Sequence, residues 1–103
     1  MSNYVLSNKA VEDLTNIWNY SFYAWSELQA DKYYSLLIDC FQELADGQSK
    51  GKKFSEINDQ ILGKLIGQHI VFYRRLSKSK VEIVRILHSS MDLKNRINED
   101  SEM

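Results

Sequence analysis

The sequence is poor in the features that mark secreted and membrane-spanning proteins. It holds one cysteine, Cys40, so no disulfide can form within the chain, which suits a reducing compartment. No apolar run approaches the roughly 18–20 residues that a membrane span needs, and the first residues lack the basic-then-apolar order of a secretion signal. We therefore expect a cytoplasmic protein that does not enter a membrane.

The residue patterns of metal, nucleotide and nucleophile sites are also missing. His69 and His88 have no cysteine or further histidine at ligand spacing, and no sequence cue places a base beside Cys40, which falls on an apolar helical stripe. Asp92 is only a loose candidate for the orienting partner that His88 would need as a general base. We expect no metal and no cofactor, and we interpret His88 as a structural or interface residue and Cys40 as core.

The composition indicates a single packed domain. The chain has 103 residues, of which 44% are hydrophobic and 12% aromatic, whereas disordered chains are short of such residues. A domain of this length buries roughly 60–70% of the surface that its unfolded form exposes. We expect one domain over residues 1–97 and a disordered polar tail at residues 98–103.

The net charge of −1 conceals an uneven distribution. Residues 1–47 carry 2 basic and 7 acidic side chains, a balance of −5, whereas residues 48–103 carry 11 basic and 7 acidic ones, a balance of +4. The basic half either attracts an acidic partner or forms an ordinary solvated surface, and charge by itself does not decide between the two.

Two amphipathic helices are predicted in the first half. Residues 4–6 form a short extended run, Ser7 can cap a helix, and apolar residues then recur at spacings of three and four. Ser26 begins a capping box for a second helix, which Gly47 ends, so the two helices form a hairpin. The apolar stripe of the first helix is Ala10, Leu14, Ile17, Trp18, Phe22 and Trp25, in which Trp25, near the helix end, is either a core residue or a partner contact. The stripe of the second helix is Ala30, Tyr33 or Tyr34, Leu37, Cys40, Phe41 and Leu44.

The hydrophobic period changes to two after a loop at residues 48–59. Residues 61–66, 69–76 and 81–88 are strand candidates rich in Val, Ile, Phe and Tyr, joined by a type II′ turn at Gly67-Gln68 and a reversal at residues 77–79. Consecutive strands with short turns are antiparallel neighbours, and residues 4–6 add a fourth strand. The predicted fold class is α+β with the order β-α-α-β-β-β, an antiparallel sheet with the two-helix hairpin packed on one face.

Arg85 is the unusual residue of the last strand. Strict alternation places Val81, Ile83, Arg85 and Leu87 on one side of this strand and Glu82, Val84, Ile86 and His88 on the other. Arg85 thus sits among apolar neighbours, where it either meets a carboxylate of the domain or awaits one from a partner. Arg74 and Arg75 end the preceding strand, where antiparallel pairing brings one of them near Arg85 or Glu82.

Several groups of residues, taken in order, match a known pattern. They are Tyr4, Leu6-Ser7, Ala10, Asp13-Leu14 and Ile17-Trp18, then Ala30 and Tyr34, then HIVFYR at residues 69–74 and VRILH followed by Met91-Asp92 at residues 84–92. In these residues, over about 4–97, the chain resembles ParE-type toxins of the RelE/ParE superfamily, the toxin half of bacterial toxin–antitoxin pairs. Ser90 stands where many relatives carry Arg, which weakens the case for a basic contact at that position.

The resemblance implies a function as well as a fold. ParE-type toxins are not enzymes: they inhibit DNA gyrase and trap it on cleaved DNA. A ParD-like antitoxin neutralises them in a hetero-oligomer through a C-terminal segment wrapped over the toxin, and the toxin meets operator DNA only through the antitoxin. The basic strand region of this chain is compatible with an acidic antitoxin segment.

The residues that we expect at the antitoxin or target interface are Arg74, Arg85, His88, Met91, Asp92, Arg96 and Trp25. We expect the segment from Arg85 to Arg96 to carry toxicity, because it combines polarity with the family's most specific motif.

Two alternatives remain at this point. A RelE-like ribosome-dependent mRNA endonuclease would use groups such as Arg74, Arg85 and His88 to activate a 2′-hydroxyl and stabilise a phosphorane. The sequence pI of about 6.1 is low for a protein that must bind ribosomal RNA. The other alternative is a non-toxic relative that only binds an antitoxin.

Overall fold

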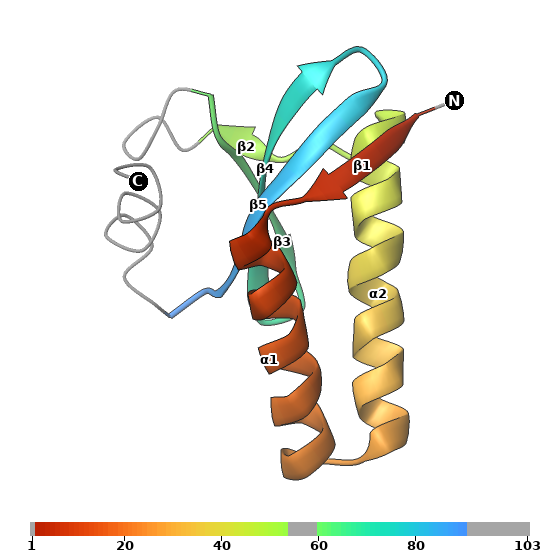
Figure 1. Cartoon of the computed structure of the whole chain (residues 1–103), viewed down its shortest axis with the longest axis vertical. Helices are drawn as coiled ribbons and strands as arrows, with labels where there is room; N and C mark the ends of the chain where they lie inside the picture. Colours follow the sequence, from red (N-terminus) through yellow and green to blue (C-terminus); the bar gives the residue numbers. More distant parts are fainter. Residues whose placement is uncertain (1, 54–59, 91–103) are drawn as a thin grey trace.

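The computed structural model describes residues 2–53 and 60–90, which form two helices and a five-stranded sheet (Figure 1). The α+β class and the packing of the helical hairpin on one face of the sheet are as predicted. The elements in chain order are β1 (Asn3–Leu6), α1 (Asn8–Ala24), α2 (Glu27–Asp46), β2 (Lys52–Lys53), β3 (Leu62–Ile66), β4 (His69–Ser77) and β5 (Lys80–His88).

The sheet is mixed, which corrects the expectation of an antiparallel one. Its strand order is β1-β5-β4-β3-β2, and β1 runs parallel to β5, with Asn3 opposite Lys80 and Leu6 opposite Ile83. Parallel neighbours need a long crossover connection, and the helical hairpin and the other strands lie between β1 and β5 along the chain. The only antiparallel pairs in the described residues are therefore those of the meander and the added strand β2.

Strand β2 lies inside the segment predicted as a loop. Lys52 and Lys53 pair with Gly63 and Leu62 of β3, and the Gly51 backbone N–H donates to the Tyr73 hydroxyl at 2.8 Å. Gly51 is close to the neighbouring backbone: a Cβ there would lie 2.5 Å from the Gly63 carbonyl oxygen. Two lysines carry no apolar alternation, so local pattern gave no sign of this strand.

The helix ends follow the predicted chemistry. Ser7 and Ser26 are the N-caps, and their hydroxyl oxygens accept hydrogen bonds from the backbone N–H groups of Ala10 and Gln29, both at 3.0 Å. Gly47 ends α2 in the left-handed conformation with φ of 80°. The Ser7 hydroxyl also donates to the carbonyl oxygen of Val84 at 2.7 Å, so the first cap ties α1 to β5.

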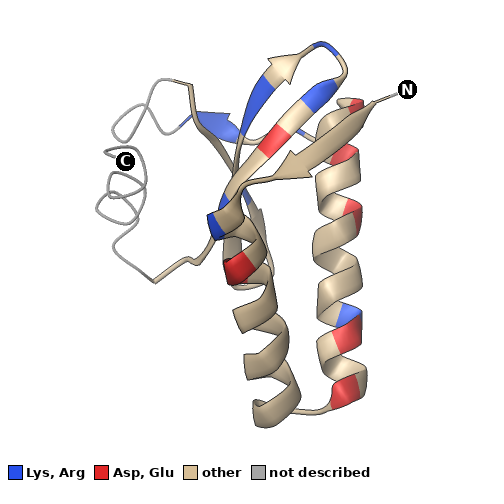
Figure 2. Cartoon of the chain, in the orientation of Figure 1, with Lys and Arg blue, Asp and Glu red and all other residues tan. Residues whose placement is uncertain are grey.

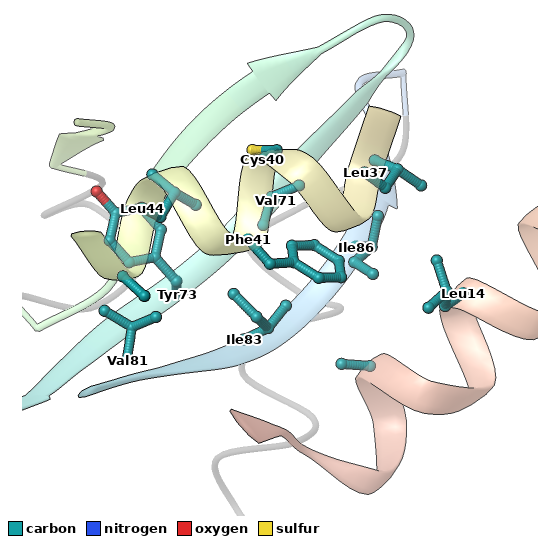
Figure 3. Packing of buried hydrophobic residues seen from close by; sticks show 12 residues of the cluster. Leu14, Leu37, Cys40, Phe41, Leu44, Val71, Tyr73, Val81, Ile83 and Ile86 are labelled. Atoms are coloured by element: carbon teal, nitrogen blue, oxygen red, sulfur yellow. The ribbon is translucent and has the colours of Figure 1, made fainter. Parts of the chain in front are cut away.

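The main core lies between α2 and the middle of the sheet. Phe41 is fully buried at its centre (Figure 3), and replacing such a side chain by alanine costs about 3–5 kcal/mol. Cys40 is buried as predicted, and burial raises the pKa of its thiol to about 11, so the thiol packs as a neutral apolar group. The other labelled members are Leu14, Leu37, Leu44, Val71, Tyr73, Val81, Ile83 and Ile86. A second cluster, formed by Ile61, Phe72 and Leu87, lies on the opposite face of the sheet.

The predicted stripe of α1 is buried only in its first half. Ala10 and Leu14 are buried, and the buried line then continues through Ser21, whose hydroxyl donates to the Ile17 carbonyl oxygen at 2.9 Å. Phe22, which we expected to be buried, is exposed, and so is Trp25, for which burial and a partner contact were both open. The end of α1 projects beyond the described strands of the sheet (Figure 1).

A β-bulge interrupts the pairing of β4 and β5. The register skips one residue of β5, Val84, between Ile83 and the pairs that follow. Ile86 therefore lies in the same helix-side core as Ile83, and Leu87 in the second cluster. The predicted strict alternation holds at Val84, which packs against the second cluster, but it is wrong at Ile86 and Leu87, because an extra residue in one strand changes the side to which later residues point.

The turn between β3 and β4 is the two-residue turn that was predicted. Ile66 pairs with His69 across it, and Gly67 has a positive φ of 56°. The ring of Tyr33 from α2 lies against this glycine, so that a Cβ at Gly67 would be 2.7 Å from the ring. Tyr33, rather than Tyr34, is thus the inward-facing tyrosine of α2, and it fixes the turn to the helix.

Candidate functional site

A groove of about 570 Å³ lies between α1 and the adjacent ends of β4 and β5. Ile17, Ile86 and Leu87 contribute apolar lining, whereas its polar lining comes from both helix and strand. The groove exists because β1 ends opposite Ile83. The rest of β5, as far as His88, therefore has no pairing with β1. The polar residues Asp13, Asn16, Ser21, Gln68, His69, Arg85, His88 and Ser90 line the groove.

Asp13 and Arg85 form a bidentate ion pair in this groove. The Nε and one terminal nitrogen of Arg85 donate to the two carboxylate oxygens of Asp13, at 2.8 and 3.0 Å. The same carboxylate accepts the backbone N–H of Ile86 at 3.0 Å, at the part of β5 that β1 does not reach. Only about a tenth of each charged side chain is exposed. Arg85 therefore meets a carboxylate of its own domain, the first of the two predicted alternatives.

A second chain of contacts runs from α2 across the strand ends. The Tyr33 hydroxyl lies 2.7 Å from Nδ1 of His69, and it also bonds the backbone on both sides of Gly67. His69 is directly opposite His88, and their rings meet edge to face with centroids 5.4 Å apart. The Ser90 backbone N–H donates to Nδ1 of His88 at 3.1 Å. Because that nitrogen accepts, a neutral His88 carries its proton on Nε2.

Burial shifts the pKa values of His69 and Tyr33 in this set of contacts. Burial lowers the pKa of His69 from 6.5, and the neighbouring His88 lowers it further, while Asp13 partly opposes the shift. Burial raises the pKa of Tyr33, partly offset by the hydrogen bond from the Gln68 N–H. Neutral forms are therefore favoured for both side chains near pH 7, and the groove end is a hydrogen-bonded cluster with little free charge.

The predicted interface residues do not form one site. The groove contains Arg85 and His88, but Arg74 lies further along the sheet, where its Nε donates to Glu82 at 2.7 Å. This pair confirms the expectation that Arg74 or Arg75 approaches Glu82. Trp25 is at the turn between the helices and does not line the groove. Met91, Asp92 and Arg96 lie outside the described residues.

Sequence reasoning did not single out Asp13 or Tyr33 as site residues. Asp13 is three residues after Ala10 and four before Ile17, so helical spacing places it on the sheet-facing side, and a buried arginine requires such a carboxylate. The pairing of His69 with His88 has no comparable local signal, because it depends on the register beyond the bulge.

Exposed basic side chains are grouped over the sheet, as the charge distribution suggested. Figure 2 shows lysine and arginine mainly on the strands and acidic residues mainly on the helices. Lys50, Lys52 and Lys64 line a shallow groove that also includes Gly51 and Gly63. The described residues hold no cluster of three or more His, Cys, Asp or Glu that could bind a metal ion, and no helix among them is long and apolar enough to cross a membrane.

Comparisons with known proteins agree on one family. A family model described as the ParE toxin of the type II toxin–antitoxin system parDE matches residues 4–93. Toxin ParE1 of Caulobacter vibrioides is 35% identical over 92 residues, which cover 89% of this chain and 94% of that protein. Toxin ParE1 of Mycobacterium tuberculosis is 30% identical with the same coverage, and Toxin ParE of Escherichia coli is 30% identical over 97 residues.

The fold is also found in a solved structure. A chain of the chromosomal ParDE toxin–antitoxin system from P. aeruginosa superposes with a TM-score of 0.69 at 18% identity, and the match covers 85% of this chain and 96% of that one. At this identity the likeness shows the shared fold. The family match over most of the chain and the curated relatives show more: this chain belongs to the ParE toxins of type II toxin–antitoxin systems, within the RelE/ParE superfamily.

Proposed function

We propose that this toxin acts in the cytoplasm by inhibiting DNA gyrase without catalysing a reaction, and that a ParD-like antitoxin neutralises it in a hetero-oligomer. Operator DNA is then contacted through the antitoxin. Membership of the ParE family supports the proposal. Gyrase inhibition is what the resemblance to ParE-type toxins implies.

The observation that carries the proposal is the bidentate pairing of Arg85 with Asp13. A RelE-like endonuclease needs cationic groups that are directed at the scissile phosphate. Arg85 instead directs two nitrogens at an internal carboxylate, and Arg74 is at a different part of the sheet, bonded to Glu82. Arg85 is thus held in a buried pair, and Arg74 forms an exposed pair away from the groove. The three groups named for the endonuclease alternative therefore do not share one site, which favours a toxin that acts by binding.

The antitoxin surface that we propose has a basic part and a groove part. Arg74 and the strand lysines attract an acidic segment, since complementary charge speeds association and selects partners. Arg85 and His88 form the groove wall, where Nε2–H of His88 is available as a donor. Met91, Asp92 and Arg96, outside the described residues, extend this proposed interface.

The first experiment is a gyrase supercoiling and DNA-cleavage assay with the purified chain, run beside a ribosome-programmed translation extract probed for cut mRNA. We expect loss of supercoiling, accumulation of cleaved DNA and intact mRNA. Cut mRNA with unaffected gyrase would transfer Arg74, Arg85 and His88 to catalytic roles. If neither activity is affected, the chain is an antitoxin-binding relative without gyrase toxicity.

Calorimetry with a ParD-like antitoxin tests the role of the groove. Arg85→Ala should weaken binding by more than the ~1 kcal/mol expected for an exposed ion pair. Asp13→Ala is the matched control, because it disturbs the same pair from the helix side. An equal loss in both variants would mean that the groove's shape, and not a direct contact of Arg85, matters for binding. Unchanged affinity in Arg85→Ala would remove this residue from the interface.

A truncation tests where toxicity resides. We propose that the segment from Arg85 to Arg96 carries it, so removing residues 89–103 should abolish growth arrest on induced expression. Circular dichroism and solubility establish that the shortened chain is folded. Growth arrest that persists in a folded, truncated chain would assign toxicity to another surface.

A further inference from the structure

The two residues that follow the last strand are both tied to the fold. The Ser89 backbone N–H donates to the carbonyl oxygen of Gln68, in the β3–β4 turn, at 3.0 Å. The Ser90 backbone N–H donates to Nδ1 of His88 at 3.1 Å, and the Ser90 hydroxyl oxygen lies 2.7 Å from the same nitrogen. Residues beyond the last element of a domain are commonly poorly ordered unless such contacts hold them. The backbone at residues 89–90 therefore has a defined course where it leaves β5.

Burial does not require these contacts. Ser89 and Ser90 are exposed, so water could satisfy both of their backbone N–H groups. An imidazole that accepts a hydrogen bond from the residue two positions on also gives up rotamer freedom to do so. The contact of His88 with Ser90 therefore adds order at this point of the chain and does not serve a buried donor.

The ring of His88 is itself held in place. It meets His69 edge to face, with centroids 5.4 Å apart, and Nδ1 of His69 lies 2.7 Å from the Tyr33 hydroxyl. Because Tyr33 belongs to α2, a line of contacts connects the helical hairpin with Ser90 through two imidazole rings. Nδ1 of His88 is thus an acceptor at a fixed place, and Nε2 of the same ring takes no part in the contact with Ser90.

We propose that His88 is a positioning residue for toxicity: its Nδ1 fixes the backbone at Ser90, from which the chain continues into the rest of the segment from Arg85 to Arg96. This inference rests on the proposed function, which assigns toxicity to that segment. A segment whose start is fixed before it meets its target loses less conformational freedom when it binds. His88 then contributes to toxicity through Nδ1 and without touching the target.

Two amide side chains of different length separate this role from a direct contact of His88. In His88→Asn the side-chain oxygen can accept the N–H two residues on, as asparagine does in Asx-turns, so it replaces Nδ1. In His88→Gln the longer amide reaches the place of Nε2 and does not favour that turn, and His88→Leu removes both groups. We expect growth arrest on induced expression from wild type and His88→Asn, and its loss in His88→Gln and His88→Leu.

Solvent-exchange NMR of the four purified chains reports the contact itself. The Ser90 N–H should exchange about two- to tenfold faster in His88→Gln and His88→Leu than in wild type and His88→Asn, which is the factor that one hydrogen bond supplies. The Ser89 N–H is the internal control, because its acceptor is the Gln68 carbonyl oxygen and its exchange should be the same in all four chains. Urea midpoints of the four chains check that no variant loses toxicity by unfolding.

A mismatch between the two measurements would overturn the inference: growth arrest that persists where protection of the Ser90 N–H is lost, or that is lost where the protection persists. Growth arrest in His88→Gln but not in His88→Asn, against the pattern of protection, would assign His88 a direct contact through Nε2 instead. A wild-type chain that does not arrest growth would overturn the proposed function, and this inference with it. The two failures are therefore distinguishable.

Discussion

The two ends of the sheet use the same kinds of side chain in different ways. At the histidine end, residues 66–69 and 85–90, the ion pair of Arg85 with Asp13 has only 10% and 13% of its side-chain surface exposed, and each imidazole is held by a hydroxyl. At the lysine end, residues 74–82, the ion pair of Arg74 with Glu82 is 45% and 25% exposed. Both are Arg–carboxylate pairs with a close contact of 2.7 or 2.8 Å.

The difference shows what burial does to a charged residue. At the histidine end the polar side chains stabilise the fold. The Asp13 carboxylate accepts the Ile86 backbone N–H, in the part of β5 that does not pair with β1, and the Tyr33 hydroxyl bonds the β3–β4 turn to α2. At the lysine end the charges remain in water, where they add little stability but attract an oppositely charged partner. The histidine end should therefore be sensitive to substitution in its stability, and the lysine end in its association with partners.

The largest effect is expected from breaking the buried pair. Asp13→Ala should lower the free energy of unfolding by about 3–5 kcal/mol, because it leaves the Arg85 guanidinium buried without its carboxylate. Urea denaturation gives the value. The double variant Asp13→Leu with Arg85→Met, which removes both charges, should be much less destabilised than Asp13→Ala. A double variant as unstable as the single one would show that the pair's charges are not what the groove depends on.

Gly67→Ala should produce the next largest loss, about 1–3 kcal/mol. A Cβ at Gly67 would adopt an unfavourable positive φ of 56° and would also lie 2.7 Å from the Tyr33 ring. Thermal unfolding measures the loss. Gly47→Ala separates the two causes, since Gly47 has φ of 80° but nothing within 4 Å of its Cβ position. Equal losses at both glycines would mean that the Tyr33 contact contributes nothing.

A smaller effect, dependent on pH, is expected from His69. Its pKa is lowered from 6.5 in the folded chain, chiefly by burial, so the unfolded chain binds the proton more readily. His69 should therefore add no pH dependence to the free energy of unfolding above pH 6.5. Below 6.5 the free energy of unfolding should fall as the pH decreases toward the pKa of His69 in the folded chain. Urea midpoints at a series of pH values should show this slope, and His69→Gln should reduce it. The same slope in both proteins would exclude His69 as its source.

The smallest effect on stability is expected at the lysine end. Arg74→Ala should change the free energy of unfolding by about 0.2–1 kcal/mol, because the pair with Glu82 is solvent-exposed. In contrast, the association rate with an acidic antitoxin segment should fall, and the difference from wild type should shrink at high salt. Stopped-flow association measures this rate. A large loss of stability with an unchanged rate would contradict the contrast between the two ends.

Much of this protein follows from its sequence alone. The N-caps Ser7 and Ser26, the terminating Gly47 and the turn at Gly67 are where residue chemistry placed them, and the strands of the meander follow the period of two as far as the bulge at Val84. A different set of residues, from Tyr4 to Asp92, carried the resemblance to ParE toxins, and the comparisons confirm that family. These features depend on neighbours within a few positions along the chain, so the local sequence determines them.

Only the tertiary structure decided the rest. The parallel pairing of β1, the bulge at Val84, the union of Arg85 with Asp13 and the meeting of His69 with His88 each depend on the register between segments far apart in the chain. Periodicity also could not show that α1 outruns the sheet, which leaves Trp25 exposed. An apolar stripe records which side chains favour burial, but the extent of the surface packed against it determines which of them are buried.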